Sequence, residues 1–162
     1  MSASWPGSTP MPKTPIHKNP TPFANTQADW WPAETRMVCA VADMPENGAR
    51  GFTLTGADKN QRLDIIIWLA GNGREAVLRG FVNKCPHMGL PLETFPDRFL
   101  SADGERLICS AHGAQFDFDG ACFAGPCKGA HLYPVDLGIE NGVIILPPQN
   151  LPKNLPQNPP QK

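Results

Sequence analysis

Two short cysteine–histidine pairs are the residues whose types and spacing point most directly to chemistry. Cys85 and His87 lie two positions apart in "NKCPHMGLPL", and Cys109 and His112 lie three positions apart in "CSAH". Two cysteines and two histidines can hold a tetrahedral structural zinc ion. They can also hold a [2Fe–2S] cluster, with both thiolates on one iron and both imidazoles on the other. The spacing therefore predicts a metal centre of one of these two kinds.

The residues around the two pairs favour the iron–sulfur cluster. Glycines beside ligands let the backbone approach closely, so that amide N–H groups can point at sulfur atoms. A Gly-Pro dipeptide forms a stiff third loop that could cap a cluster, and a zinc ribbon needs neither feature. The supporting positions are Gly89, Leu92, Gly113, Phe116, Gly125 and Pro126.

Short apolar segments, separated by glycine, proline, asparagine and aspartate, predict an all-β fold. "AGNGRE" (70–75) and "ENG" (140–142) are typical of hairpin turns. No segment combines helical length with a period of 3.6 residues, so we expect an antiparallel sandwich or a small barrel. The expected strands cover residues 36–42, 51–55, 62–70, 76–83, 106–109, 114–118, 133–140 and 143–146.

Proline marks two expected tails, 1–35 and 147–162, around one folded domain over 36–146. Of the 19 prolines, 7 lie in the first tail and 6 in the second. Neither tail has periodic apolar residues whose burial could offset the entropy of ordering the chain, so we expect both to be disordered. Trp30 and Trp31, at the junction, are expected to pack on the domain, and a partner-binding motif is the alternative.

Charge and hydropathy exclude several classes of protein. The net charge of -1 at pH 7 gives no basic patch for nucleic acid. No apolar run approaches the ~20 residues of a membrane helix, and the N-terminus has no apolar signal region and no twin arginine. The expected compartment is the cytoplasm, where thiols stay reduced and clustered cysteines suggest metal or redox chemistry.

The pattern C-x-H-x-G-x-x-L … C-x-x-H-G-x-x-F … G-P resembles that of the Rieske iron–sulfur family. The resemblance covers the whole expected domain. It implies a Rieske-like antiparallel β-sandwich with a small cluster-binding subdomain over about residues 84–127. It also implies one Rieske-type [2Fe–2S] cluster per chain. The gap between the pairs is longer than expected for the family, so residues 94–105 are expected to hold an inserted turn. The implied ligands are Cys85, His87, Cys109 and His112.

The ligand loops lack features of the quinol-oxidising Rieske proteins. Those proteins have an inter-loop disulfide where this chain has Leu90 and Ala111. They also have a serine and a tyrosine near the sulfurs where this chain has Ala114 and Phe116. Fewer hydrogen bonds to the sulfurs stabilise the extra electron less. We therefore expect a potential near the low end of the roughly −150 to +300 mV Rieske range.

The resemblance implies an electron-transfer component rather than a catalyst acting alone. The chain has no room and no spare histidines for the 2-His-1-carboxylate iron site of Rieske oxygenases. It resembles free-standing Rieske ferredoxins and small Rieske subunits, which implies a reductase and a terminal oxygenase or reductase as redox partners. We expect a monomer with no nucleic-acid or membrane partner. The alternatives are a redox- or iron-responsive binding module with the same cluster, and a zinc-stabilised structural domain.

An apolar rim is expected around the exposed histidines. It would either dock a redox partner or only shield the cluster from water. The rim consists of Met88, Leu90, Pro91 and Pro126.

The remaining cysteines and histidines have other expected roles. Cys122 and Cys127 flank the Gly-Pro loop in "CFAGPC", a spacing that permits a disulfide if the loop turns tightly. Alternatively, both are small buried apolar residues beside the cluster. Cys39 is expected to pack in the core, His17 lies in a tail, and His131 is expected on the surface.

Overall fold

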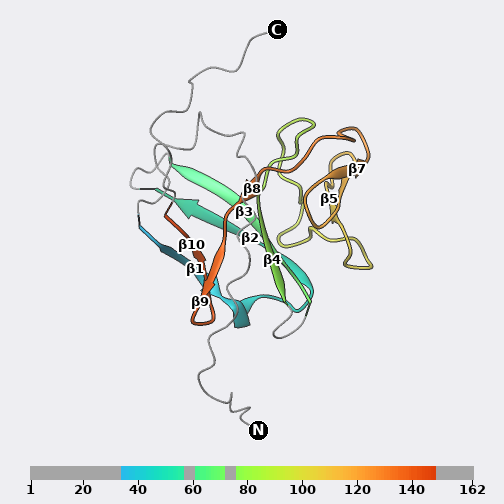
Figure 1. Cartoon of the computed structure of the whole chain (residues 1–162). Coiled ribbons are helices and arrows are strands. Elements are labelled where there is room, and N and C mark those ends of the chain that lie inside the picture. Colours follow the sequence, from blue (N-terminus) through green and yellow to red (C-terminus); the bar gives the residue numbers. More distant parts are fainter. Residues whose placement is uncertain (1–33, 57–60, 72–75, 149–162) are drawn as a thin grey trace.

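Antiparallel sheets make up the regular structure of the computed structural model, which describes residues 34–56, 61–71 and 76–148 (Figure 1). Across these ranges the helical structure is one 3-10 turn, η1 (Val41–Asp43), and no helix is long and apolar enough to cross a membrane. The all-β prediction is confirmed. The strands are β1 (Arg36–Ala40), β2 (Gly48–Thr55), β3 (Arg62–Ala70), β4 (Val77–Val82), β5 (Leu107–Ile108), β6 (Gln115–Phe116), β7 (Cys122–Ala124), β8 (Pro134–Val135), β9 (Gly138–Glu140) and β10 (Val143–Leu146).

The strands form three sheets, in the orders β2-β3-β4-β8, β1-β10-β9 and β5-β6-β7. In Figure 1 the small β5-β6-β7 sheet lies to one side of β4, while β1, β9 and β10 lie together below β2 and β3. The expected tails fall almost entirely outside the described residues, as do Trp30 and Trp31.

Strand β3 separates two hydrophobic cores. Successive side chains of a strand point to opposite faces. Accordingly, Ile66 and Trp68 pack in the core that contains the cysteines of both pairs. Ile65 and Ile67 pack in the other core, with Ile144 of β10. The run "IIIWL" is continuously apolar because both faces of this strand are buried.

The hairpin between β9 and β10 forms where the sequence predicts it. Val143 pairs with Glu140, and Asn141 and Gly142 between them have φ values of 51° and 78°. Positive φ at both central residues defines the type I′ turn that Asn-Gly favours. The predicted hairpin at 70–75 also joins two antiparallel strands, β3 and β4, although residues 72–75 lie outside the described ranges.

Several strand predictions are wrong in detail. The expected strand 133–140 is two strands, because β8 pairs with β4 whereas β9 pairs with β10. The expected strand 36–42 ends at Ala40, where the chain turns into η1. Strand β7 was not predicted, since three residues carry no periodicity. The other differences are at strand ends: β2 begins at Gly48, β4 spans 77–82, β5 spans 107–108 and β6 spans 115–116.

Candidate metal centre

The first ligand loop follows β4 and turns back on itself within six residues. The backbone N–H of Cys85 donates to the carbonyl of Leu90 at 2.8 Å, and the N–H of Gly89 donates to the carbonyl of Cys85 at 2.8 Å. Gly89 has a φ of +72°, a conformation that residues with a Cβ rarely adopt. The turn leaves His87 and Met88 exposed at its tip while Cys85 is buried.

The second ligand loop, between β5 and β6, has the same backbone closure. The N–H of Cys109 donates to the carbonyl of Ala114 at 2.8 Å, and the N–H of Gly113 donates to the carbonyl of Cys109 at 2.9 Å. Gly113 has a φ of +71°. In both loops the backbone N–H of the cysteine therefore hydrogen-bonds to the carbonyl of the residue five positions later. In both loops, too, a glycine in the left-handed conformation lies four positions after the cysteine.

The two loops are joined to each other. The backbone N–H of Ser110, in the second loop, donates to the carbonyl of Leu92, at the end of the first, at 2.7 Å. Leu92 is fully buried in the same core as Cys85 and Cys109. The core and this hydrogen bond together hold the two loops side by side.

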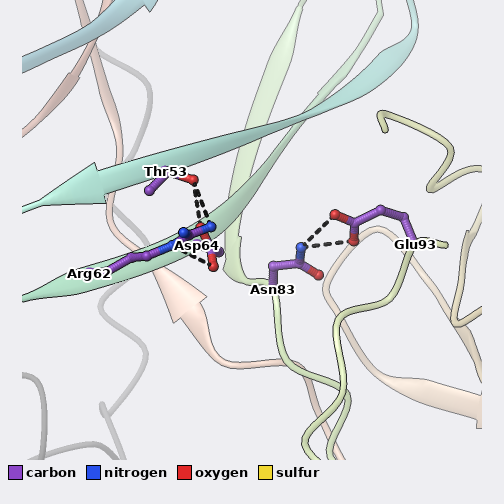
Figure 2. Close-up of polar contacts among 5 residues, drawn as sticks. All are labelled: Thr53, Arg62, Asp64, Asn83 and Glu93. Atoms are coloured by element: carbon purple, nitrogen blue, oxygen red, sulfur yellow. Dashed lines mark hydrogen bonds and ion pairs between the residues drawn. The ribbon is translucent and has the colours of Figure 1, made fainter. Parts of the chain in front are cut away.

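Asn83 anchors the first loop at its base. Its side-chain oxygen accepts from the N–H of Leu92 at 2.9 Å, and its amide donates to both oxygens of Glu93 at 3.0 and 2.8 Å (Figure 2). Its backbone N–H donates to the carbonyl of Asp64 on β3 at 2.8 Å. Asn83 thus ties both ends of the loop to each other and to the central sheet. Asn83 was not predicted as a site residue, although a polar residue between an apolar strand and a ligand pair is a signal.

The four predicted ligands come together as two pairs of like side chains. The imidazoles of His87 and His112 face each other edge to face, with ring centroids 5.0 Å apart, and both are exposed. The thiols of Cys85 and Cys109 interact with each other beneath them and are almost fully buried. In the described part of the chain, no three His, Cys, Asp or Glu side chains converge so as to hold one metal ion.

This arrangement fits a two-iron cluster better than a single zinc ion. A tetrahedral zinc site needs all four ligands around one point, whereas a [2Fe–2S] cluster takes two thiolates at one iron and two imidazoles at the other. Burial raises the pKa of the Cys85 thiol, and the neighbouring Cys109 thiol raises it further, against a backbone N–H from His87 that lowers it. A thiolate at Cys85 therefore needs a bound cation beside it.

A third loop packs against the second. Gly125 has a φ of +95°, and a Cβ placed on it would lie 2.7 Å from the Cα of Ala114. Only glycine allows the third loop to approach the second this closely. Phe116 and Ala114 are fully buried below it, while Pro126 is exposed.

Cys122 and Cys127 lie at the two ends of this loop, both buried and both with free thiols. Their sulfur atoms are 2.9 Å apart. Burial and then the Cys122 thiol raise the pKa of Cys127 to about 12, so Cys127 is a neutral thiol at physiological pH. Cys39 is half-buried against the other core, as expected for a packing role.

The apolar side chains predicted to form the rim are exposed. Met88 and Leu90 are 63% and 43% exposed, and Pro91 and Pro126 are also exposed. Two exposed aromatic residues, Phe95 and Phe123, were not predicted. Phe95 lies in the expected insertion 94–105, and Phe123 lies on β7, the strand that the sequence analysis missed. His131 is exposed, as expected.

Comparison with protein families matches residues 34–146 of this chain to the Rieske [2Fe-2S] domain. This chain belongs to the Rieske [2Fe–2S] family. Membership implies a Rieske-type [2Fe–2S] cluster, whose chemistry is the transfer of one electron at a time. The zinc-stabilised alternative is therefore not favoured.

Solved structures share the fold at low sequence identity. A chain from the complex of reduced oxygenase and oxidised ferredoxin in carbazole 1,9a-dioxygenase is 19% identical, with a TM-score of 0.53, over 73% of this chain and 96% of that chain. The ferredoxin of carbazole 1,9a-dioxygenase from Nocardioides aromaticivorans IC177 is 18% identical, with a TM-score of 0.51, over 72% of this chain and 99% of that chain.

A larger enzyme shares the fold only in part. For the quaternary ammonium Rieske monooxygenase CntA the TM-score is 0.54 at 18% identity, and the match covers 75% of this chain but 32% of that chain. The present chain thus spans about a third of that enzyme. A search of curated protein sequences gave no match.

Proposed function

We propose that this Rieske protein is a one-electron carrier that holds its cluster through Cys85, His87, Cys109 and His112. The observation that carries the proposal is the shared closure of the two ligand loops, which pairs two buried thiols beneath two exposed imidazoles. When bound, the cluster supplies reversible one-electron transfer.

The buried thiols and the exposed imidazoles would have different roles in electron transfer. The buried thiols exclude water from one side of the site, and the N–H of His87 donates to the Cys85 sulfur, where negative charge gathers. The exposed imidazoles bring the other side to the protein surface, where an electron can pass to a partner.

The partners we propose are a reductase as donor and a terminal oxygenase or reductase as acceptor. The exposed apolar rim of Met88, Leu90, Pro91 and Pro126 is the docking surface in this proposal. A structural neighbour from a complex of oxygenase and ferredoxin supports this class of partner. Reduced, clustered thiols support the cytoplasm as the compartment, and we propose that the free chain is a monomer.

The test is an electron paramagnetic resonance spectrum of the dithionite-reduced full chain, with iron and sulfide measured on the same sample. The expected result is a rhombic signal with the low average g value of mixed Cys and His ligation, at two irons and two sulfides per chain. The purified protein should then pass its electron rapidly to an added acceptor such as cytochrome c. A colourless protein that contains zinc would contradict the proposal.

A further inference from the structure

Cys122 and Cys127 are held close together by backbone hydrogen bonds around them. The N–H of Cys122 donates to the carbonyl of Ala130 at 2.8 Å, and the N–H of Gly129 donates to the carbonyl of Cys122 at 2.8 Å. The N–H of Ala130 donates to the carbonyl of Cys127 at 2.9 Å. The two sulfurs are 2.9 Å apart, so the ~2.05 Å of a disulfide bond needs an approach of under about 1 Å.

The pair also faces the proposed cluster site. Cys85, Cys122 and Cys127 share one hydrophobic core, and the Cys127 thiol interacts with the sulfurs of both Cys122 and Cys85. The S–H group of Cys127 can donate toward the Cys85 sulfur. A hydrogen bond to a ligating sulfur stabilises the reduced, more negative state of a cluster and raises its potential.

We propose that Cys122 and Cys127 form a reversible disulfide when the protein meets a peroxide, and that the disulfide lowers the potential of the cluster. The proposal rests on the proposed function, because it takes Cys85 as a ligand. Neither cysteine is needed as a ligand under that function, so the two thiols are available to bond to each other.

The oxidation balances with hydrogen peroxide as the oxidant. One thiol sulfur attacks the O–O bond, which breaks, and the sulfur becomes a sulfenic acid while one water leaves. The second thiol sulfur attacks the sulfenic sulfur, the S–S bond forms, the S–O bond breaks and a second water leaves. Together the two sulfurs lose the two electrons that the peroxide gains. The new bond removes the S–H donor of Cys127 from Cys85, and a dithiol such as dithiothreitol restores it.

The experiment treats the cluster-loaded full chain with about one equivalent of hydrogen peroxide, and then alkylates all free thiols under acid-quenched denaturing conditions. The tryptic peptide 107–128, "LICSAHGAQFDFDGACFAGPCK", contains Cys109, Cys122 and Cys127. The expected product carries an alkyl group on Cys109 alone and an S–S bond between the other two. After reduction with dithiothreitol, all three cysteines of this peptide should be alkylated. Three alkylated cysteines after peroxide treatment, with an intact cluster spectrum, would overturn the proposal.

Two variants separate the disulfide from its effect on the potential, which is measured by voltammetry. Cys127→Ala removes the donor, so its potential should match that of the peroxide-treated wild type. Cys122→Ala keeps the donor but cannot form the bond, so its potential should stay at the untreated wild-type value in peroxide. If the potential of Cys122→Ala fell on treatment while the peptide map still showed Cys127 fully alkylated, peroxide would be acting on the cluster, and the proposal would be overturned.

Failure of the proposed function would look different. A chain that binds no [2Fe–2S] cluster would show no visible spectrum and no potential to measure. The peptide map would still report whether the 122–127 bond forms. If only the disulfide proposal were wrong, the cluster signal would be present, and Cys122 and Cys127 would remain unbonded after peroxide treatment.

Discussion

The imidazole rings of His87 and His112 lie edge to face, with centroids 5.0 Å apart and planes at 87° to each other. They come from loops that are 25 positions apart in the chain, and they meet because the two loops close in the same way and are joined through Ser110 and Leu92. His131, the third histidine of the described residues, is exposed, and its backbone pairs with that of Ala121.

Replacing His87 with cysteine should change the visible spectrum and the potential of the protein. A thiolate brings a negative charge to the site where the imidazole is neutral, so the reduced state is disfavoured and the potential falls. His131→Ala is the control, because this exposed histidine belongs to neither pair. Absorbance and voltammetry measure the effect. A His87→Cys protein with the wild-type spectrum would refute His87 as a ligand.

Two glycines of the third loop allow a matched test of close packing. Gly125 and Gly129 have φ values of +95° and +91°, but only a Cβ on Gly125 meets another residue, at 2.7 Å from the Cα of Ala114. Gly129→Ala should cost only the strained backbone, about 1–2 kcal/mol. Gly125→Ala should cost more and reduce the iron content, because it displaces the second ligand loop. Thermal melts and iron analysis would show this, and equal effects of the two changes would contradict it.

Asn83→Ala should loosen the first ligand loop. The change removes the acceptor for the Leu92 N–H and the donor to Glu93, for an expected loss of about 1–3 kcal/mol. Thr53→Ala is the control, since Thr53 bonds Asp64 on the exposed face of the sheet (Figure 2) and such surface changes usually cost less than ~0.5 kcal/mol. Denaturant unfolding of the loaded protein compares them. If both variants lost the same stability, Asn83 would have no special role in the loop.

Adding hydroxyl groups beside the sulfurs should raise the potential. Ala114 and Phe116 are fully buried in the core that holds Cys85 and Cys109. Ala114→Ser and Phe116→Tyr each offer an O–H donor, and a hydrogen bond worth about 1 kcal/mol corresponds to roughly 40 mV for one electron. Phe118→Tyr, on a ring that packs against Trp68, is the control and should leave the potential unchanged. If the potentials of Ala114→Ser and Phe116→Tyr equalled that of the wild type, the missing O–H donors would not be the cause of a low potential.

Changes at Leu90 and Ala111 should leave cluster assembly intact. Both residues are exposed on the ligand loops, at the positions where quinol-oxidising relatives have a disulfide. Leu90→Ala and Ala111→Ser remove no buried contact, so the iron content after purification should equal that of the wild type. A loss of cluster in either variant would show that these side chains support the loops.

Local patterns in the sequence were enough to predict the fold class, the candidate ligands and most of the strands. Cysteine, histidine and glycine at fixed spacing are local features, and their chemistry limits what they can bind. The type I′ turn at Asn141 and Gly142 is equally local, because two residues alone prefer its dihedral angles. The long apolar run of β3 also predicted a strand correctly, although it could not say which core each face would meet.

Contacts between separate segments of the chain became visible in the folded structure alone. The sequence did not show that Asn83 would close the first loop, or that residues 133–140 would divide between two sheets. It left open whether Cys122 and Cys127 approach each other, and it did not place Cys127 against Cys85. These contacts depend on long-range packing, where the backbone of one loop sets the position of another. Spacing along the chain limits which contacts are possible, but it does not set these distances.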